Sequence, residues 1–294
     1  MGVYNVAERW TWYVSMRVII HDLPHKSRSD WFEIIPIGCV HLGNALCDEA
    51  ALRRTVKHIK DTKHCYWGGM GDMIDGINRA DKRFQESHIA EWLWGRDDVV
   101  GPQIELLCQI LEPIKDKCLW MLRGNHEDFV LQKFQRDVYY EICRNMGLSE
   151  TNPIMLGYRG FIVMRMQRQK SGTGGGSTYT YTVFAHHGYG GGRLEGGKAL
   201  KLGRLPKHYQ ADLLLYGHEH VKMIGQPIQQ LRPTASGGIV GKMIYTCMTG
   251  TYLQSYDGDG VKEVYSEVQN LPPSALGSIT VKVNPDRQEV QVTM

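Results

Sequence analysis

Short apolar runs alternate with helical patterns along most of this chain, and this alternation constrains the fold more than any other feature. Between residue 37 and about residue 220, helical periodicity occurs at 45–60, 82–94, 102–117 and 127–146. Candidate strands lie between these segments at 65–69, 118–122, 180–185 and 213–216. Alternation of this kind is typical of a sheet built from βαβ units, so we expect an α/β fold.

Both ends of the chain carry β patterns instead. A β-rich run at 10–20, a polar turn at 21–30 and a second run at 31–37 predict a leading β hairpin beginning within residues 1–33. Beyond residue 220 the helical periodicity stops, and runs at 243–247, 278–283 and 289–293 alternate by twos. We therefore expect an antiparallel β tail over 221–294, packed on the same core. Neither a repeat nor a long linker divides the chain, which predicts a single domain over 1–294.

Composition excludes several protein classes. A chain of 294 residues with 42% hydrophobic side chains can bury a large core, which argues against a disordered chain or a small disulfide-stapled scaffold. The formal charge of +3 neither demands nor excludes a phosphate-bearing ligand. The longest apolar run near the start, 12–20, contains Arg17 and is shorter than the roughly 20 residues of a membrane span, so we expect neither signal peptide nor membrane contact. Seven cysteines without a CxxC pair predict reduced thiols and a cytoplasmic location.

Residues able to bind metal ions recur where an apolar run ends in glycine. Five clusters read Gly38-Cys39-Val40-His41, Gly71-Asp72-Met73-Ile74-Asp75, Gly124-Asn125-His126-Glu127, His186-His187-Gly188 and Gly217-His218-Glu219-His220. Taken singly, each has a structural alternative, such as a hydrogen-bonded histidine, a helix cap or an ordinary turn. The carboxyl ends of strands in an open α/β sheet border one crevice, so we expect the five clusters to converge on a metal site.

The order of these clusters resembles the pattern of the calcineurin-like metallophosphoesterases, which runs D-x-H, G-D, G-N-H-E/D, H-G and G-H-x-H. The resemblance covers about residues 34–220, and the segments at 190–193, 249–252 and 272–277 are similar to phage and prophage members. It implies a fold of two packed mixed sheets flanked by helices. It also implies a two-metal centre and hydrolysis of a phosphodiester or phosphomonoester.

Carried over position by position, the resemblance implies two sets of metal ligands. The first metal would take Cys39, His41, Asp72 and His220, and the second would take Asp72 as a bridge with Asn125, His187 and His218. Two divalent cations about 3.5–4 Å apart activate a bridging hydroxide and stabilise the charge that develops during displacement at phosphorus. The resemblance makes Asp72 and His126 catalytic, with His126 as the proton donor to the leaving group. His187 is preferred over His186 because Gly188 follows it directly, although His186 remains an alternative.

Cys39 stands where the family pattern has its first aspartate. A thiolate suits zinc or ferrous iron better than harder cations, so the cofactors we expect are two ions of zinc, iron or manganese. The alternative is a degenerate site in which Cys39 only packs as a small apolar side chain. Glu127 and Asp75 are either residues that orient the ligands or acids at a helix start.

The substrate is less constrained. Lys198, Lys201, Arg204 and Lys207, with Arg193, line the approach for a polyanion or form a solvated basic surface. DNA or RNA is our favoured substrate, which makes the chain a nuclease-like phosphodiesterase. The alternatives are a small-molecule phosphatase and an interaction scaffold that has lost a metal.

Overall fold

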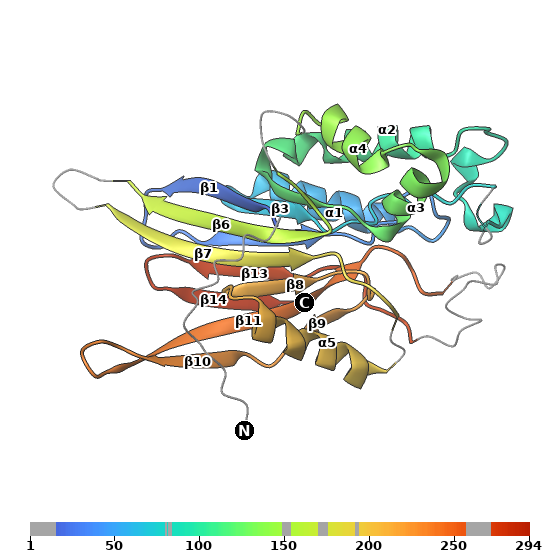
Figure 1. The fold of residues 1–294 in the computed structure, drawn as a ribbon. Coiled ribbons are helices and arrows are strands. Elements are labelled where there is room, and N and C mark those ends of the chain that lie inside the picture. The colour runs from blue at the N-terminus through green and yellow to red at the C-terminus, as the bar shows by residue number, and fades with distance from the viewer. Residues whose placement is uncertain are drawn as a thin grey trace, which may run out of the picture.

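The structure is a computed structural model that describes residues 16–79, 81, 84–148, 154–169, 176–191, 194–256 and 272–294. Its strands form two mixed sheets (Figure 1). The first has the order β1-β6-β7-β8-β11-β10, with β9 and β12 also paired to β11. The second has the order β14-β13-β2-β3-β4-β5.

The strand bounds are as follows. The first sheet contains β1 (Val18–His25), β6 (Arg159–Arg168), β7 (Ser177–His186), β8 (Leu213–Tyr216), β9 (Lys222–Ile224), β10 (Ile228–Pro233), β11 (Ile239–Thr251) and β12 (Gly277–Ser278). The second contains β2 (Phe32–Ile37), β3 (Cys65–Gly69), β4 (Cys118–Leu122), β5 (Met155–Gly157), β13 (Thr280–Asn284) and β14 (Glu289–Thr293).

Helices lie on both outer faces. They are α1 (Glu49–Asp61), α2 (Val100–Leu111), α3 (Asn125–Phe134), α4 (Val138–Asn145) and α5 (Glu195–His208). Figure 1 shows α1 to α4 gathered on one side of the strands and α5 on the other, beside β8 and β11. The expected fold of two mixed sheets flanked by helices is confirmed. Within the described ranges, no helix has the length and apolar character that crossing a membrane requires.

The main hydrophobic core includes side chains from both sheets and from α1, α2 and α4. Helix α1 shows how the sequence specifies this packing. Asp48 caps the helix by accepting a hydrogen bond from the Ala51 amide at 2.8 Å, and Leu52, Val56 and Ile59 form its buried stripe. A smaller cluster lies between α5 and the first sheet, where Leu202 and Leu205 are buried.

The predicted leading hairpin is wrong in the part that the structure describes. Strand β1 extends into the expected turn, as far as His25, and pairs in parallel with β6. Strand β2 pairs with β3 and β13 in the other sheet. Burial explains the separation. All six residues of β2 are buried, so β2 needs a strand on each side, while Val18 and Ile20 of β1 are exposed at a sheet edge. Residues 10–15 lie outside the described ranges.

Three predicted helices are interrupted. Segment 127–146 divides into α3 and α4, because Gln135 adopts a left-handed φ of 55° and Asp137 caps a new helix. Segment 102–117 ends as a 3₁₀ helix over Glu112–Lys117, which contains Pro113. The described part of 82–94 forms only two short 3₁₀ turns, Glu86–His88 and Glu91–Leu93. Its backbone bonds outward instead, since Ala90 N donates to Gly43 O at 2.9 Å.

The tail differs from the expectation in one respect. Strand β11 is antiparallel to β9, β10 and β12 but parallel to β8, so the tail is not purely antiparallel. Strands β13 and β14 pair in antiparallel fashion, and Val281 and Val283 join the main core through the pairing of β13 with β2. A single domain over residues 1–294 stays a prediction.

Candidate metal centre

The five clusters of potential metal ligands follow strands of both sheets. Three of them follow β2, β3 and β4, which are parallel neighbours in the second sheet. The other two follow β7 and β8, which are parallel neighbours in the first sheet. Because all five clusters leave the carboxyl ends of their strands, their side chains meet where the two sheets adjoin. The candidate ligands therefore come from both sheets, and not from one open sheet as we expected.

The first ligand group consists of Cys39, His41, Asp72 and His220. One potential ligand atom from each residue lies within 4.8 Å of the others. His41 Nε2 is 3.1 Å from His220 Nε2 and 4.0 Å from Asp72 Oδ2. Cys39, His41 and Asp72 are buried and His220 is half-buried, so these donors face one another out of bulk water.

The second ligand group consists of Asp72, His187 and His218, again within 4.8 Å of one another. His187 Nε2 lies 3.3 Å from Asp72 Oδ2 and 3.1 Å from Asn125 Oδ1. His187 Nδ1 donates a hydrogen bond to the Met70 carbonyl at 2.6 Å, which aims Nε2 at the other donors. Asp72 is the one residue common to both groups, and Asn125 adjoins the second.

His186 lies in a different environment from His187. Its ring stacks on Tyr216 with centroids 5.5 Å apart, and its Nδ1 accepts a hydrogen bond from the Gly188 amide at 2.7 Å. Burial lowers the pKa of His186 to about 4, with the charge of Arg159 adding to the shift. The geometry favours His187 over His186 as the ligand.

His126 and Asp75 border the first ligand group. The His126 ring lies edge-on to the His41 ring at 4.5 Å between centroids, and its Nδ1 donates to the Asp75 carbonyl at 2.5 Å. The Asp75 carboxylate lies 3.5 Å from His41 Nδ1 and 3.8 Å from His126 Nδ1. His126 and His41 thus share one carboxylate at the edge of the site.

Glu127 holds the loop that carries Asp72. Its buried carboxylate accepts hydrogen bonds from the amides of Gly124 (2.8 Å), Asp72 (3.0 Å) and Met73 (2.7 Å). Gly124 permits this contact, because a Cβ there would lie 2.2 Å from the Asp72 amide nitrogen. Glu127 has both of the roles that we considered, because the Gly124 bond caps the start of α3 and the bonds from Asp72 and Met73 orient the site.

The backbone is strained at the ligand positions. Five non-glycine residues of the two groups have φ in the left-handed region: Cys39 (47°), His41 (51°), Asp72 (52°), His218 (67°) and His220 (54°). Each such conformation costs about 1 kcal/mol or more, and clusters of them occur mainly at functional sites. Turning the backbone in this way directs side chains from separate loops to one point.

The electrostatics of the groups fit a cation. Burial opposes the charge of Asp72, yet His187 and His126 hold its pKa well below the usual value. Burial also lowers the pKa of His187, but the Asp72 carboxylate outweighs this effect and raises it to about 9. Burial raises the pKa of the Cys39 thiol well above its usual value, and Asp72 adds to the shift.

Two nitrogens of the groups, His41 Nδ1 and His218 Nδ1, are buried and make no hydrogen bond with any part of the chain that the structure describes. Buried polar atoms of this kind ordinarily have a partner. A set of imidazoles, a shared carboxylate, an amide oxygen and a thiol is a suitable donor set for zinc, iron or manganese. The residues therefore fit two metal ions.

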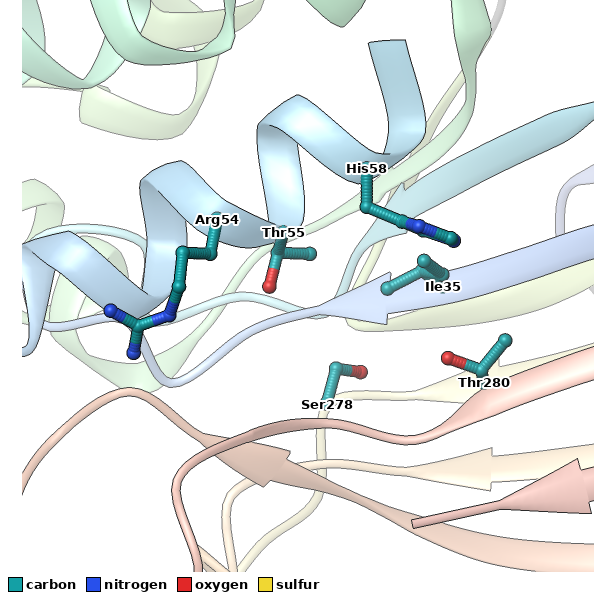
Figure 2. A pocket seen from close by; sticks show the side chains of 6 residues that line it. All are labelled: Ile35, Arg54, Thr55, His58, Ser278 and Thr280. Carbon is teal, nitrogen blue, oxygen red and sulfur yellow. The ribbon is translucent and has the colours of Figure 1, made fainter. Parts of the chain in front are cut away.

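Cavities also occur away from the ligand groups. A crevice of about 340 Å³ lies between α1 and the strands beside it. Figure 2 shows the side chains that line it. Its lining residues are Ile35, Arg54, Thr55, His58, Ser278 and Thr280. None of them belongs to either ligand group, so this crevice is separate from the candidate centre.

The basic residues expected to line one approach have different environments. Lys198 is buried, and Lys201 is ion-paired with Glu219. Arg204 and Lys207 are exposed on α5, which continues through Pro206 in its last turn. Arg193 lies outside the described residues. Of the four that the structure describes, only Arg204 and Lys207 are both exposed and outside an ion pair with Glu219.

Sequence reasoning missed two contacts of the site. The spacing of the basic residues does not pair Lys201 with Glu219. No pattern in the tail predicts that the Thr251 hydroxyl donates to the Cys39 carbonyl at 2.9 Å. The signal that could have found the first contact is the place of Glu219 between His218 and His220. A carboxylate buried with these residues needs a partner of opposite charge.

Comparisons with known proteins add distant structural likenesses. No protein-family model matches the sequence, and no curated protein is similar to it in sequence. A metallophosphoesterase from Sphaerobacter thermophilus is similar at 14% identity and a TM-score of 0.37, covering 89% of this chain and 87% of that one. A predicted phosphoesterase from Streptococcus pneumoniae is similar at 11% identity and a TM-score of 0.33, covering 90% and 98%. An NAD nucleotidase from Haemophilus influenzae is similar at 9% identity and a TM-score of 0.35, covering 92% and 50%. These likenesses are too distant to assign an activity.

Proposed function

We propose that this chain is a dinuclear metal-dependent phosphoesterase of the calcineurin-like kind, hydrolysing a phosphodiester or a phosphomonoester. One observation carries the proposal. Asp72 Oδ2 lies 4.0 Å from His41 Nε2 and 3.3 Å from His187 Nε2, so a single carboxylate joins two histidine-containing ligand groups. A shared carboxylate is the residue that two neighbouring cations need, because its charge offsets their repulsion.

The two ligand groups would each hold one divalent cation, the first with Cys39 and the second with Asn125 completing it. When bound, such ions lower the pKa of a water, polarise the phosphoryl oxygens and stabilise the developing charge. The chain itself supplies the rigid placement of the ligands. Glu127 holds the Asp72 loop, and the Met70 carbonyl fixes the ring of His187.

His126 is the proposed proton donor to the leaving oxygen. Its Nδ1 hydrogen is committed to the Asp75 carbonyl, so donation from Nε2 requires the doubly protonated imidazolium. The Asp75 carboxylate lies 3.8 Å from His126 Nδ1, on the side of the ring away from Nε2. We infer that Asp75 and His126 act together on the leaving-group side of the site.

We propose nucleic acid as the substrate class. We also propose that the protein is cytoplasmic and of phage type. Support for nucleic acid is limited to the exposed cations Arg204 and Lys207 on α5. A small-molecule phosphatase is the alternative, because Lys198 and Lys201 are not free to extend that surface. A metal-deficient scaffold is the other alternative, and it depends on Cys39 being only a packing residue.

The decisive experiment combines metal analysis with hydrolysis. Protein purified without added metal is analysed for bound elements, then assayed on bis(p-nitrophenyl) phosphate, p-nitrophenyl phosphate and single-stranded DNA, with and without a chelator. We expect close to two metal ions per chain and chelator-sensitive hydrolysis, both of which Asp72→Asn should reduce strongly. Less than about half an ion per chain and no activity after addition of zinc, iron or manganese would favour the scaffold.

A further inference from the structure

Glu219 stands between two candidate ligands of different groups, His218 and His220, and is not itself a member of either group. Its side chain is 2% exposed and forms an ion pair with the Lys201 ammonium of α5. A buried carboxylate that loses its partner is strongly destabilising. Lys201 therefore anchors the loop that carries His218 and His220 to a helix outside the metal centre.

The same ammonium also anchors the loop that follows His187. Lys201 Nζ donates to the carbonyl of Gly190 at 2.8 Å and to the carbonyl of Tyr189 at 3.2 Å. The Tyr216 hydroxyl reinforces this loop, since it accepts from the Tyr189 amide at 2.9 Å and donates to the Tyr189 carbonyl at 3.2 Å. One lysine thus joins the two loops that carry the histidines of the second ligand group.

The two loops are packed closely enough for their positions to depend on each other. A Cβ at Gly188 would lie 2.7 Å from both Gly217 O and His218 Cβ, and a Cβ at Gly217 would lie 2.8 Å from His187 O. No water or side chain fits between backbones at such distances. A shift of either loop is therefore passed to the other, and with it to His187 or His218.

Lys201 has no hydrogen-bonding capacity left for a substrate. An ammonium has three N–H donors, and here they meet Glu219, Gly190 O and Tyr189 O. Its position on a basic helix suggests a substrate contact, but its geometry does not. The Lys201 ammonium therefore interacts with the protein itself and has no donor left for a bound anion.

We propose that Lys201 is a positioning residue for the second ligand group: it fixes the loop after His187 against the loop of His218 and His220, and so sets the geometry in which a metal ion is bound there. This inference rests on the proposed function. The first ligand group should depend on it less, because only His220 of its four members lies on a loop that Lys201 anchors, whereas Cys39, His41 and Asp72 lie on other loops.

The test compares Lys201→Met, which keeps the length of the side chain but removes its charge, with Lys201→Arg, which keeps the charge. Lys115→Met is the matched control, because it removes another lysine ion pair, to Glu112 at 2.6 Å, on a helix without a ligand residue. Zinc and manganese are titrated into chelator-treated protein to measure the affinity of each site. Hydrogen–deuterium exchange of peptides covering 186–191 and 217–220 is measured in the absence of metal.

We expect Lys201→Met to weaken the second of two metal-binding equilibria about tenfold or more, with a smaller change in the first. Exchange should become faster in both loops together, Lys201→Arg should recover part of each effect, and Lys115→Met should change neither. A lower melting temperature with unchanged metal affinities and unchanged loop exchange would overturn the inference, because it would show a merely structural ion pair.

Failure of the proposed function would look different. If the wild-type protein bound no metal, that result alone would contradict a two-metal centre. Loop exchange in the same metal-free samples would still decide the role of Lys201. Faster exchange in both loops of Lys201→Met would support the anchoring, and unchanged exchange would overturn it.

Discussion

His41 Nε2 lies 3.1 Å from His220 Nε2, although the two residues are 179 positions apart in the chain. Only one of two facing nitrogens can carry the shared hydrogen, so the pair is a weakly satisfied contact between two potential metal donors. Burial lowers the pKa of His220 well below its usual value, and the nearby His41 lowers it further. A neutral imidazole is the form that binds a metal ion.

Metal binding should therefore stabilise the folded protein. A cation that binds only the folded state at about 100 times its Kd adds about 2.7 kcal/mol to the free energy of unfolding. We expect zinc or manganese to raise the melting temperature, and a chelator to reverse the change, in a thermal unfolding experiment. His220→Ala should show a smaller increase, and an increase equal to that of the wild type would remove His220 from the ligand set.

His126→Ala should lower turnover more on a substrate with a poor leaving group than on one with a good leaving group. A poor leaving group needs the proton that His126 is proposed to donate, and general acid catalysis typically contributes about 10²–10⁴-fold. The comparison uses an alkyl and a nitrophenyl ester of the same phosphate, with metal content measured in parallel. Equal losses on both substrates would indicate a structural role, and loss of metal would make His126 a ligand.

Cys39→Ser should weaken the first site, because a hydroxyl replaces a thiolate poorly as a metal donor. Cys39→Asp should restore binding and shift preference toward manganese, since carboxylate oxygen suits harder cations than sulfur does. Metal titrations of the three proteins check both expectations.

Unchanged metal content, preference and activity in Cys39→Ser would show that Cys39 is a packing residue. The raised pKa of its buried thiol makes this a real alternative, because without a cation the thiol stays neutral at pH 7. Thr251 would then hold the Cys39 backbone for packing alone.

Glu33 should contribute stability that depends on pH. Burial raises its pKa, but hydrogen bonds from Lys282 and His58, each at 2.7 Å, outweigh burial and leave the pKa below the usual 4.5. A lowered carboxyl pKa stabilises the fold above about pH 4.5, and the contribution is lost as the pH falls through the folded-state value. Glu33→Gln should lower the free energy of unfolding at pH 7 by about 1 kcal/mol, given the partial exposure of both partners.

The measurement is urea unfolding of wild type and Glu33→Gln between pH 3 and pH 7. The difference between the two proteins should shrink as the pH falls below 4.5. Glu112→Gln, which removes an exposed carboxylate paired with Lys115, is the control and should show a smaller difference at pH 7. A pH-independent difference for Glu33→Gln would contradict the assignment.

Local pattern was sufficient for much of this protein. Strands β3, β4 and β8 have the predicted bounds, because runs of buried residues between turns are specified by nearby sequence. The order of the five clusters also indicated where the donors would gather, since each follows a strand end. Asp72, His187 and Asn125 are brought together as that reasoning expected.

Other features depended on contacts between distant segments. The sequence could not place β1 and β2 in different sheets, because adjacent strands can pair with each other or with distant partners, and only competition for burial decides between them. Local sequence also did not predict the division of 127–146 into two helices or the pairing of Lys201 with Glu219. By itself, the sequence determined which potential metal ligands the chain has and at which strand ends they lie. The tertiary structure alone decided which of them touch, because backbone turns at Cys39, His41, Asp72, His218 and His220 set side-chain direction only once both sheets are packed.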